Sequence, residues 1–411
     1  MSPRPPLPLV TLAPLACLLV LACSGVEKPV APPSLEPEAA PAMLEPVDLS
    51  CPGCNLIVLN MGNLRADHLG LMAPAMGLPD LGLTPAVDRF FAQGLILEQA
   101  SSPSGATYYS ATSIATATEA MFNGHTMRED DASSIPSLGS ERAEKWLEGG
   151  GRWIVLAALA REGPLLVDRL PTLAQTLATA GYHTMAVNDW IHTGEHVHLD
   201  RGFEDYIDLT DTSRTGPHDW TTTIPVLLQV ELVLERLSAH RQAQPERPVY
   251  LYFHSNALHF PYPHPSDPEV LVARHDGPEL FTQAYRQQLR AMDTALGRAF
   301  EELERDGWLE DSVVLLYANH GLSLGEHGVL GMGKATQPCV HAPVLMHHPR
   351  LHGARRVVAP VSLVDLAPTL YELLEVEPRP MTTAHSMLPL LAGTGPYERP
   401  ALFGRDIQEE W

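Results

Sequence analysis

Three short polar clusters hold the residues of this chain that are best suited to act together in one site. They are NMGNLR at 60–65, HSNALH at 254–259 and ANHG at 318–321, and each follows directly on an apolar run of strand length. In an open parallel sheet, binding and catalytic sites form outside the carboxyl ends of the strands. The spacing therefore predicts that the three clusters converge on one edge of a sheet, which we call the rim.

The elements that must position the rim follow from the hydrophobic pattern. Continuous apolar runs predict buried strands, and helical spacing predicts the helices between them. The expected strands are 55–60, 183–187, 248–254, 312–318 and 343–347, and the expected helices are 84–93, 170–180, 285–303 and 363–374. Strands that alternate with helices predict an α/β fold, with a mainly parallel central sheet sandwiched by helices and a short C-terminal subdomain.

The longest helix is expected because apolar side chains recur at steps of three and four residues and Gly307 follows them. The residues of this face are Tyr285, Leu289, Met292, Leu296, Phe300 and Leu303. By contrast, the stretch 126–168 has no clean period, and we expect it to be an insertion.

The N-terminus indicates secretion. An apolar run from Leu7 to Ala22 follows Arg4 and is too short for a membrane span of roughly 20 residues, as expected of a signal peptide. Its end, VLAC, resembles a bacterial lipobox, so 1–23 is predicted to be a lipoprotein signal whose Cys23 carries lipid. The alternative is a plain secretory signal with an accidental cysteine. The predicted location is the bacterial cell envelope, anchored in the lipid bilayer and favouring the outer membrane.

The segment 24–50 is rich in Pro, Glu and Ala, and we expect it to form a semi-extended tether. Cys51 and Cys54 come next, before the first predicted strand, and in an oxidising compartment they are expected to form a small structural disulfide. A thioredoxin-like redox pair is the alternative, although that motif follows a strand. Cys339 lies in apolar surroundings and is expected to be a buried thiol.

Charge excludes one class of partner. The chain has 27 basic and 49 acidic residues, for a formal net charge of −22. A field of that sign repels the phosphate backbone, so nucleic-acid binding is excluded.

Eight segments together resemble the sulfatase family of the alkaline phosphatase superfamily, in its order and rough spacing. They are NLIVLNMGNLRADHLG at 55–70, TPAVDRFFAQG at 84–94, LPTLAQTLATAGYHT at 170–184, DRGFEDYID at 200–208, HSNALHFPY at 254–262, YANHGLSLGEHG at 317–328, GMGKAT at 331–336 and SLVDLAPTLYELL at 362–374. The resemblance implies a sulfatase-like α/β domain over 51–375, with 376–411 as a C-terminal extension of the same domain. It also implies a divalent cation, often calcium, held by Asp side chains.

This chain departs from the family pattern at the implied metal ligands. Gly62 and Asn63 stand where the family has one or two Asp after the first strand, and Asn319 replaces the later Asp beside a retained His320. All four positions are neutral, whereas a hard cation needs several oxygen ligands that include carboxylates. We therefore expect no tightly bound cofactor; calcium or magnesium would belong to an active form. A softer ion using His254, His259 or His320 would have a weak site.

The resemblance also assigns roles to other positions. Thr107 falls at the family's nucleophile, while Tyr109 and Ala111 replace the Pro and the Arg or His that accompany it. Thr107 is also a good helix N-cap residue, which is the alternative. His259 and Lys334 match residues that contact the substrate anion, a sulfate or phosphate ester.

Other positions have structural interpretations. His320 is expected to be a relic that hydrogen-bonds its neighbours. Arg65 and Asp67 are expected to pair with each other or to cap a helix, and Glu326 and His327 are expected to be structural.

Two functions compete on this basis. The first is a sulfatase-family envelope lipoprotein without metal-dependent ester hydrolysis, a pseudoenzyme that binds an anion or a partner. The second is an active hydrolase of sulfuric or phosphoric esters with atypical ligands and Thr107 as nucleophile. A periplasmic redox protein using Cys51 and Cys54 is a weaker third hypothesis.

Overall fold

The computed structural model describes residues 44–119, 170–190, 193–194, 197–210, 224–377, 384–397 and 399. The predicted signal peptide, Cys23, most of the tether and the insertion at 126–168 lie outside these residues. Within them, no helix is long and apolar enough to cross a membrane.

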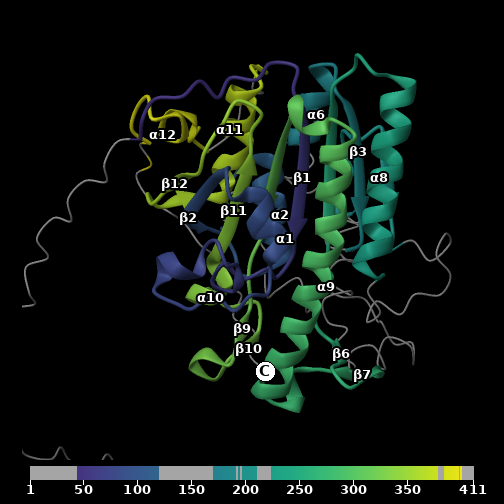
Figure 1. Ribbon diagram of the computed structural model, residues 1–411, viewed down its shortest axis with the longest axis vertical. Helices are drawn as coiled ribbons and strands as arrows, with labels where there is room; N and C mark the ends of the chain where they lie inside the picture. The colour runs from purple at the N-terminus through teal and green to yellow at the C-terminus, as the bar shows by residue number, and fades with distance from the viewer. Residues whose placement is uncertain are drawn as a thin grey trace, which may run out of the picture. The chain divides into compact units, whose positions relative to one another are not determined.

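The core of the fold is a mostly parallel nine-stranded sheet (Figure 1). The strand order is β12-β2-β11-β8-β1-β5-β3-β4, with β13 pairing with β2. The strands are β1 (Asn55–Met61), β2 (Leu95–Ser101), β3 (His183–Asn188), β4 (Asp205–Asp208), β5 (Val249–Ser255), β8 (Ser312–Tyr317), β11 (His341–His347), β12 (Arg355–Val357) and β13 (Val361–Ser362).

The central strand β1 is buried at every position. It pairs in parallel with β5 on one side and with β8 on the other, so that Ile57 lies between Leu251 and Val314. A strand with helices over both faces has no solvent side, which is why its sequence is a continuous apolar run. The predicted strands here are confirmed. Only β11 runs antiparallel to its neighbours β2 and β8.

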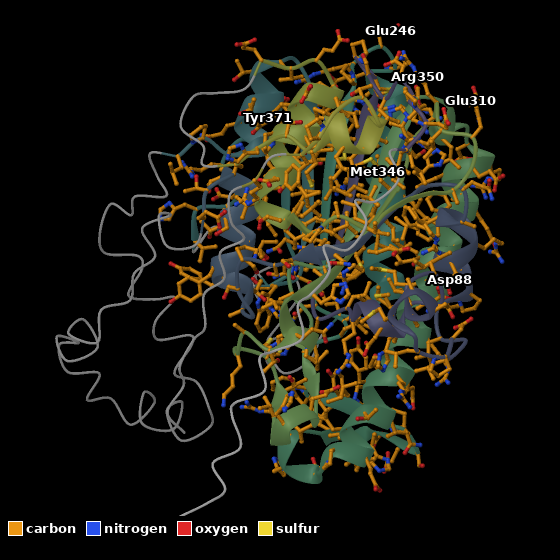
Figure 2. All side chains as sticks on the ribbon, turned by 90° about the vertical axis from the view of Figure 1, so that its left-hand side faces the viewer. Asp88, Glu246, Glu310, Met346, Arg350 and Tyr371 are labelled. Carbon is orange, nitrogen blue, oxygen red and sulfur yellow. A yellow bond between two sulfur atoms is a disulfide. The ribbon has the colours of Figure 1, made fainter. Side chains whose placement is uncertain are left out.

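Helices cover both faces of the sheet (Figure 1). One face packs against α1 (Pro85–Phe91), α8 (Val226–Ala243) and α9 (Pro278–Arg305). The other packs against α2 (Thr107–Thr116), α6 (Leu173–Thr179), α11 (Leu366–Leu373) and α12 (Leu388–Ala392). Figure 2 shows Met346 of β11 and Tyr371 of α11, which are both buried between the sheet and this second set of helices, while Arg350 and Glu310 lie at the surface.

The remaining elements are short and connect or flank these layers. They are the strands β6 (Tyr262–His264), β7 (Asp267–Val272), β9 (Ser323–Leu324) and β10 (Leu330–Gly331), the helix α10 (Gln337–Val340), and the 3-10 helices η1 (Ala66–His68), η2 (Ala73–Met76), η7 (Arg274–Asp276), η8 (Trp308–Glu310), η9 (Glu326–Gly328) and η10 (Leu363–Asp365).

Local signals account for the helix boundaries. All six apolar residues predicted for the long helix are buried on α9, which ends at Arg305 before Gly307 at φ 72°. The helix predicted at 170–180 begins later, at Leu173, because Thr172 caps it. The Thr172 side chain accepts from the amide of Gln175, and the Gln175 side chain accepts from the amide of Thr172, both at 3.1 Å.

A buried ion cluster ties the C-terminal segment to the domain. The Arg399 guanidinium lies between the carboxylates of Glu119 and Asp365, and all three side chains are at most 4% exposed. Asp365 also accepts from the amide of His385 at 2.8 Å. Leu391 of α12 packs in the same core cluster as α11. The C-terminal segment is therefore held by both charge and apolar burial.

Replacing Arg399 by Met is expected to destabilise the protein by about 3–5 kcal/mol, because two buried carboxylates would lose their cation. The measurement is the free energy of unfolding from urea titration. Arg350→Met is the matched control, since Arg350 pairs with Asp48 in an exposed ion pair and should cost less than about 1 kcal/mol. Equal losses in the two variants would show that Arg399 is not a buried counter-ion.

Candidate functional site

The three polar clusters meet at the carboxyl ends of β1, β5 and β8, as the sequence predicts. A Cβ atom placed on Gly62 would lie 3.6 Å from Nε2 of His254, 3.6 Å from Oδ1 of Asn319 and 3.5 Å from the carbonyl oxygen of Ser255. The amide of Gly62 donates to that carbonyl at 3.0 Å. Residues from three strands therefore surround one small space beside Gly62.

Two buried amide side chains join the strands at the rim. Asn60 accepts from the amide of Asn319 at 3.1 Å and donates to the hydroxyl of Tyr252 at 2.9 Å. Asn319 in turn donates through Nδ2 to Oγ of Ser110 at 3.2 Å. Because the Ser110 hydroxyl itself donates to the carbonyl of Ala106 at 3.0 Å, it must accept from Asn319. This chain of bonds orients Oδ1 of Asn319 toward Gly62.

Thr107 and His320 form a buried pair across 213 residues of sequence. Oγ1 of Thr107 lies 2.9 Å from Nε2 of His320, and Nδ1 of His320 lies 2.7 Å from the carbonyl oxygen of Gly321. Since a carbonyl only accepts, Nδ1 carries the proton and Nε2 accepts from the threonine hydroxyl. The alternative of Thr107 as an N-cap is wrong, because α2 begins at Thr107 and Ala106 is the cap.

The environment of His320 limits its strength as a base. Burial lowers its pKa to about 4, against a hydrogen bond to Gly321 that acts the other way, and nearby His254 lowers it further. The imidazole is therefore neutral at pH 7, which a general base requires. A base with so low a pKa is nevertheless a weak proton acceptor. The geometry is that of a nucleophile with its base, whereas the electrostatics favour a stable neutral hydrogen bond.

The residues at the family's metal positions do not fit a hard divalent cation. Gly62, Asn63, Asn319 and His320 supply no carboxylate, and Nε2 of His320 already accepts from Thr107. Among the residues that the structure describes, no group of three or more His, Cys, Asp or Glu side chains is arranged to hold a metal ion. Calcium and magnesium prefer several oxygen ligands that include carboxylates. That neither binds tightly here stays a prediction.

Asp189 is a rim residue that the sequence analysis missed. It follows β3 and its side chain is 3% exposed. Its carboxylate accepts from the amide of Asn256 and from Nε2 of Gln229, both at 2.7 Å, and lies 3.5 Å from Nδ1 of His254. The signal was present, because Asp189 follows a predicted strand as the other clusters do. The rim therefore has a carboxylate, at a different place from the family's metal ligands.

The two predicted anion-contacting residues lie near the rim on different segments. His259 follows β5, and its ring packs against Trp190 and Phe260 at centroid distances of 4.7 and 4.8 Å. Lys334 is exposed. Its loop is tied to the residues before α2 by the amide of Gly333, which donates to the carbonyl of Gly105 at 2.8 Å. Lys334 thus lies in a loop beside the start of α2.

Two neighbouring loops are locked together by an ion network. Arg65 pairs with Asp67, as expected, and also with Glu326 at 2.7 Å. Although burial opposes it, hydrogen bonds from Arg65 and His68 hold the pKa of Asp67 well below its usual range. Glu326 also accepts from the amide of Leu324 at 2.6 Å. These charges are satisfied by one another, so their role is structural.

The cysteines lie away from the rim. The structure has a disulfide between Cys51 and Cys54, ahead of β1. Cys339 is a buried free thiol, as expected.

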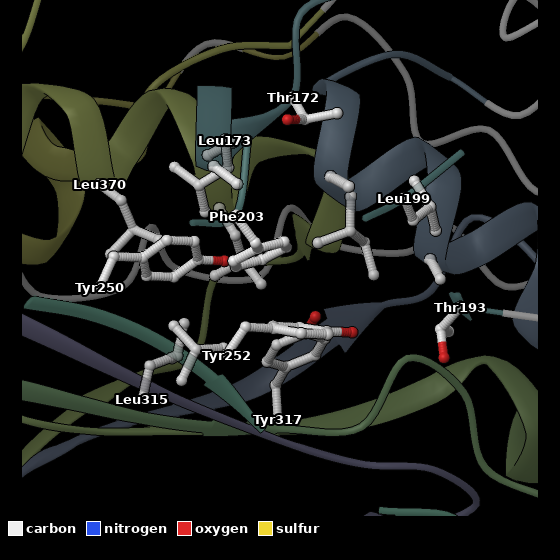
Figure 3. Close-up of a pocket in the computed structure, with 17 residues that line it drawn as sticks. Thr172, Leu173, Thr193, Leu199, Phe203, Tyr250, Tyr252, Leu315, Tyr317 and Leu370 are labelled. Carbon is white, nitrogen blue, oxygen red and sulfur yellow. The ribbon is translucent and has the colours of Figure 1, made fainter. Parts of the chain in front are cut away.

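A cavity of about 40 Å³ lies beneath α2 (Figure 3). Its lining includes Ala111 and Ile114 of α2 together with Tyr250, Tyr252 and Tyr317 of the sheet. Ala111 lies one helical turn after Thr107 and stands where the family has Arg or His. The short side chain leaves a mainly apolar space in place of a cationic group under the nucleophile position.

Comparison with known proteins bears on this geometry. A sequence model of the sulfatase family matches residues 55–376. N-acetylglucosamine-6-O-sulfatase of Bacteroides thetaiotaomicron is 28% identical over 127 residues, which cover 29% of this chain and 23% of that protein. The matches to the first two curated relatives span only 22% and 23% of their length.

Solved structures share the fold. Phosphonate monoester hydrolase of Agrobacterium radiobacter has a TM-score of 0.57 at 16% identity, covering 84% of this chain and 78% of that one. A protein of the alkaline phosphatase superfamily from Vibrio parahaemolyticus has a TM-score of 0.53 at 17% identity, covering 82% and 71%. At such identities the likeness shows the fold alone, and it confirms the predicted α/β class.

Acid is expected to destabilise the protein through His320. The pKa of His320 is 6.5 in the unfolded chain and about 4 when the ring is buried. The neutral ring therefore makes its full contribution to the free energy of unfolding above pH 6.5. It is lost as the pH falls toward 4, by roughly 3 kcal/mol in all. Urea unfolding of the wild type and of His320→Gln between pH 7 and 4 measures this.

The His320→Gln variant should lose stability less steeply with acid than the wild type. The exposed His275 supplies the control, because His275→Gln should keep the wild-type slope. A His320→Gln slope that equals the wild-type slope would contradict the assignment.

Proposed function

The chain belongs to the sulfatase family, and on this premise we propose that it binds a sulfate or phosphate ester group at the cell envelope without metal-dependent hydrolysis. The observation that carries the proposal is the set of side chains at the family's metal positions. Gly62, Asn63, Asn319 and His320 offer a divalent ion no carboxylate. At an effective dielectric constant of about 20, each close carboxylate contact is worth several kcal/mol before desolvation.

The replacement of a cationic side chain near Thr107 supports the same proposal. Family catalysis relies on cationic groups around the nucleophile, and here Ala111 stands in place of the accompanying Arg or His, beside a mainly apolar cavity. Thr107 keeps its position, but its partner His320 is a weak base because burial lowers its pKa to about 4. The carboxylates that would hold a metal and the cationic side chain at position 111, which would stabilise the charge on a transferred sulfuryl or phosphoryl group, are both replaced here by neutral residues.

Several groups remain that favour an oxyanion. Lys334 lies in the loop beside the first turn of α2, and His259 follows the end of β5. The side-chain amide of Asn63 is buried, and no partner for it occurs within the described ranges. Amide and ammonium donors bind an oxyanion without a metal. Two similar proteins, an N-acetylglucosamine-6-O-sulfatase and a phosphonate monoester hydrolase, act on esters of the same class of oxyanion, which supports this class of ligand.

Placement at the envelope rests on the N-terminal sequence. The apolar run ending in VLAC at 20–23 and the tether that follows support a lipid anchor at Cys23.

Cys23→Ser is expected to move the chain from the membrane fraction to the soluble fraction when cells are fractionated. An unchanged membrane association would contradict a lipid anchor at this residue.

A second candidate function is ester hydrolysis with Thr107 as nucleophile. The specific observation in its favour is the 2.9 Å contact between Thr107 and His320, which has the geometry of a nucleophile with its base. The two candidates differ in turnover, and one experiment separates them.

We expect the intact chain to bind inorganic sulfate or phosphate in the presence of EDTA, as measured by calorimetry. We also expect no turnover of aryl sulfate or aryl phosphate with added calcium, magnesium, manganese or zinc. Turnover that Thr107→Ala abolishes would favour the hydrolase instead.

The matched control is the double variant Gly62→Asp with Asn319→Asp. A Cβ at Gly62 meets its neighbours only in ordinary van der Waals contact, so the first side-chain carbon of the aspartate is accommodated. Restored carboxylates should give the double variant a measurable affinity for calcium that the wild type lacks. A wild type that already binds calcium as tightly as the double variant would overturn the proposal.

A further inference from the structure

Three tyrosines of the sheet border the cavity beneath α2. They are Tyr250 and Tyr252 of β5 and Tyr317 of β8, and the cavity has a volume of about 40 Å³ (Figure 3). Tyr250 and Tyr317 are each only 3% exposed. A hydroxyl group buried to this extent normally has a hydrogen-bond partner. The hydrogen bonds of the three hydroxyls therefore decide what the cavity can hold.

The hydroxyls of Tyr252 and Tyr317 together leave at least one hydrogen without an acceptor. Tyr252 accepts from Nδ2 of Asn60 at 2.9 Å, and its hydroxyl also shares a hydrogen bond with the hydroxyl of Tyr317. Figure 3 shows these two groups close together at the cavity. A bond between two hydroxyls uses one of their two hydrogens. No acceptor for the other occurs in the part of the chain that the structure describes.

The hydroxyl of Tyr250 is a second donor at the cavity. No hydrogen-bond partner for it occurs among the described residues, and its ring packs against Phe203 at a centroid distance of 5.6 Å. Burial raises the pKa of Tyr250 well above its usual value, so the hydroxyl keeps its hydrogen near neutral pH. The hydrogen of Tyr250 and the one left over from the other two tyrosines therefore both need an acceptor.

The rest of the cavity wall is mainly apolar. The hydroxyls of the two threonines in the wall are used elsewhere, because Thr172 donates to the carbonyl of Arg201 and Thr193 to the carbonyl of Trp190, both at 2.9 Å. A matching ligand must therefore bring its own lone pairs to the two phenolic hydrogens.

The size of the cavity selects among such ligands. An ordered water molecule needs roughly 10–15 Å³ of a cavity, whereas a cavity that takes benzene has about 150 Å³. The volume of about 40 Å³ beneath α2 thus has room for about three water molecules and is too small for an aromatic ring or a sugar.

We propose that the cavity beneath α2 is a binding site for about three ordered water molecules, which accept hydrogen bonds from Tyr250 and from the Tyr252–Tyr317 pair. Each water oxygen has two lone pairs and each water has two hydrogens, so the molecules also bond to one another. A buried water typically makes two to four hydrogen bonds to polar groups that would otherwise be unpaired. The site is independent of the proposed anion binding.

The bound water completes a hydrogen-bonded path from beneath α2 to the rim. The path runs from the water cluster through Tyr252 to Asn60, whose side chain accepts from the amide of Asn319 at 3.1 Å. Buried water that bridges polar groups is costly to remove. The cluster therefore helps to fix Tyr252, and through it the amide that joins the strand ends at the rim.

Tyr250→Phe tests the proposal through the sign of its effect on stability. If water accepts from the hydroxyl, the variant loses one hydrogen bond, and its unfolding equilibrium constant should rise about fivefold. If the hydroxyl is unpaired, its removal should lower that constant, because a buried unpaired group destabilises the fold. The measurement is urea unfolding of the intact, detergent-solubilised chain. A Tyr250→Phe variant at least as stable as the wild type would overturn the proposal.

Tyr262→Phe is the matched control. Tyr262 is also buried, and its hydroxyl donates to the carbonyl of Leu258 at 3.0 Å. This variant should be destabilised whatever the cavity holds, and it calibrates the loss of one buried hydroxyl bond.

A high-resolution crystal structure of the intact chain gives an independent measurement. Electron density for water is expected within hydrogen-bond distance of the Tyr250 hydroxyl oxygen. A cavity without such density would overturn the proposal even if Tyr250→Phe is destabilised.

Discussion

The hydrogen bonds of one buried amide, Asn60, hold together the strand ends on which every candidate function depends. Its side chain joins the amide of Asn319 after β8 to the hydroxyl of Tyr252 on β5, and Asn60 itself stands on β1 between them. The backbone ladders pair these strands up to Asn60, and the side chain of Asn60 extends the links to the segment that follows β8. The space beside Gly62 has its dimensions because these three strand ends are fixed.

The rim has a buried carboxylate, but it does not lie at the positions where the family holds a metal ion. The positions next to β1 and β8 are neutral, and the buried carboxylate belongs to Asp189, after β3, beside His254. A divalent ion needs its carboxylates on the ion, whereas a carboxylate behind an imidazole strengthens that ring as a hydrogen-bond donor. The buried carboxylate of the rim therefore lies beside the His254 ring and not at the family's metal positions.

The Thr107–His320 pair has the geometry of a catalytic dyad, but its surroundings make the histidine a weak base. Its 2.9 Å contact has the form of a catalytic dyad, yet the ring is wholly buried and its pKa is lowered to about 4. The pair forms a satisfied hydrogen bond inside the rim, where both groups would otherwise be buried and unpaired.

Residue types and local pattern were sufficient to predict the apolar strands β1, β5 and β8, the amphipathic helix α9, and the absence of carboxylates at Gly62 and Asn319. These follow from neighbours along the chain. Helix α2 has no apolar stripe because it is buried nearly all round. The antiparallel direction of β11 is seen only in its pairing with β2 and β8. The contact of Thr107 with His320 and the place of Asp189 behind His254 were likewise decided by tertiary packing. Hydrogen bonds between distant residues depend on where long-range packing sets each backbone, which no local pattern encodes.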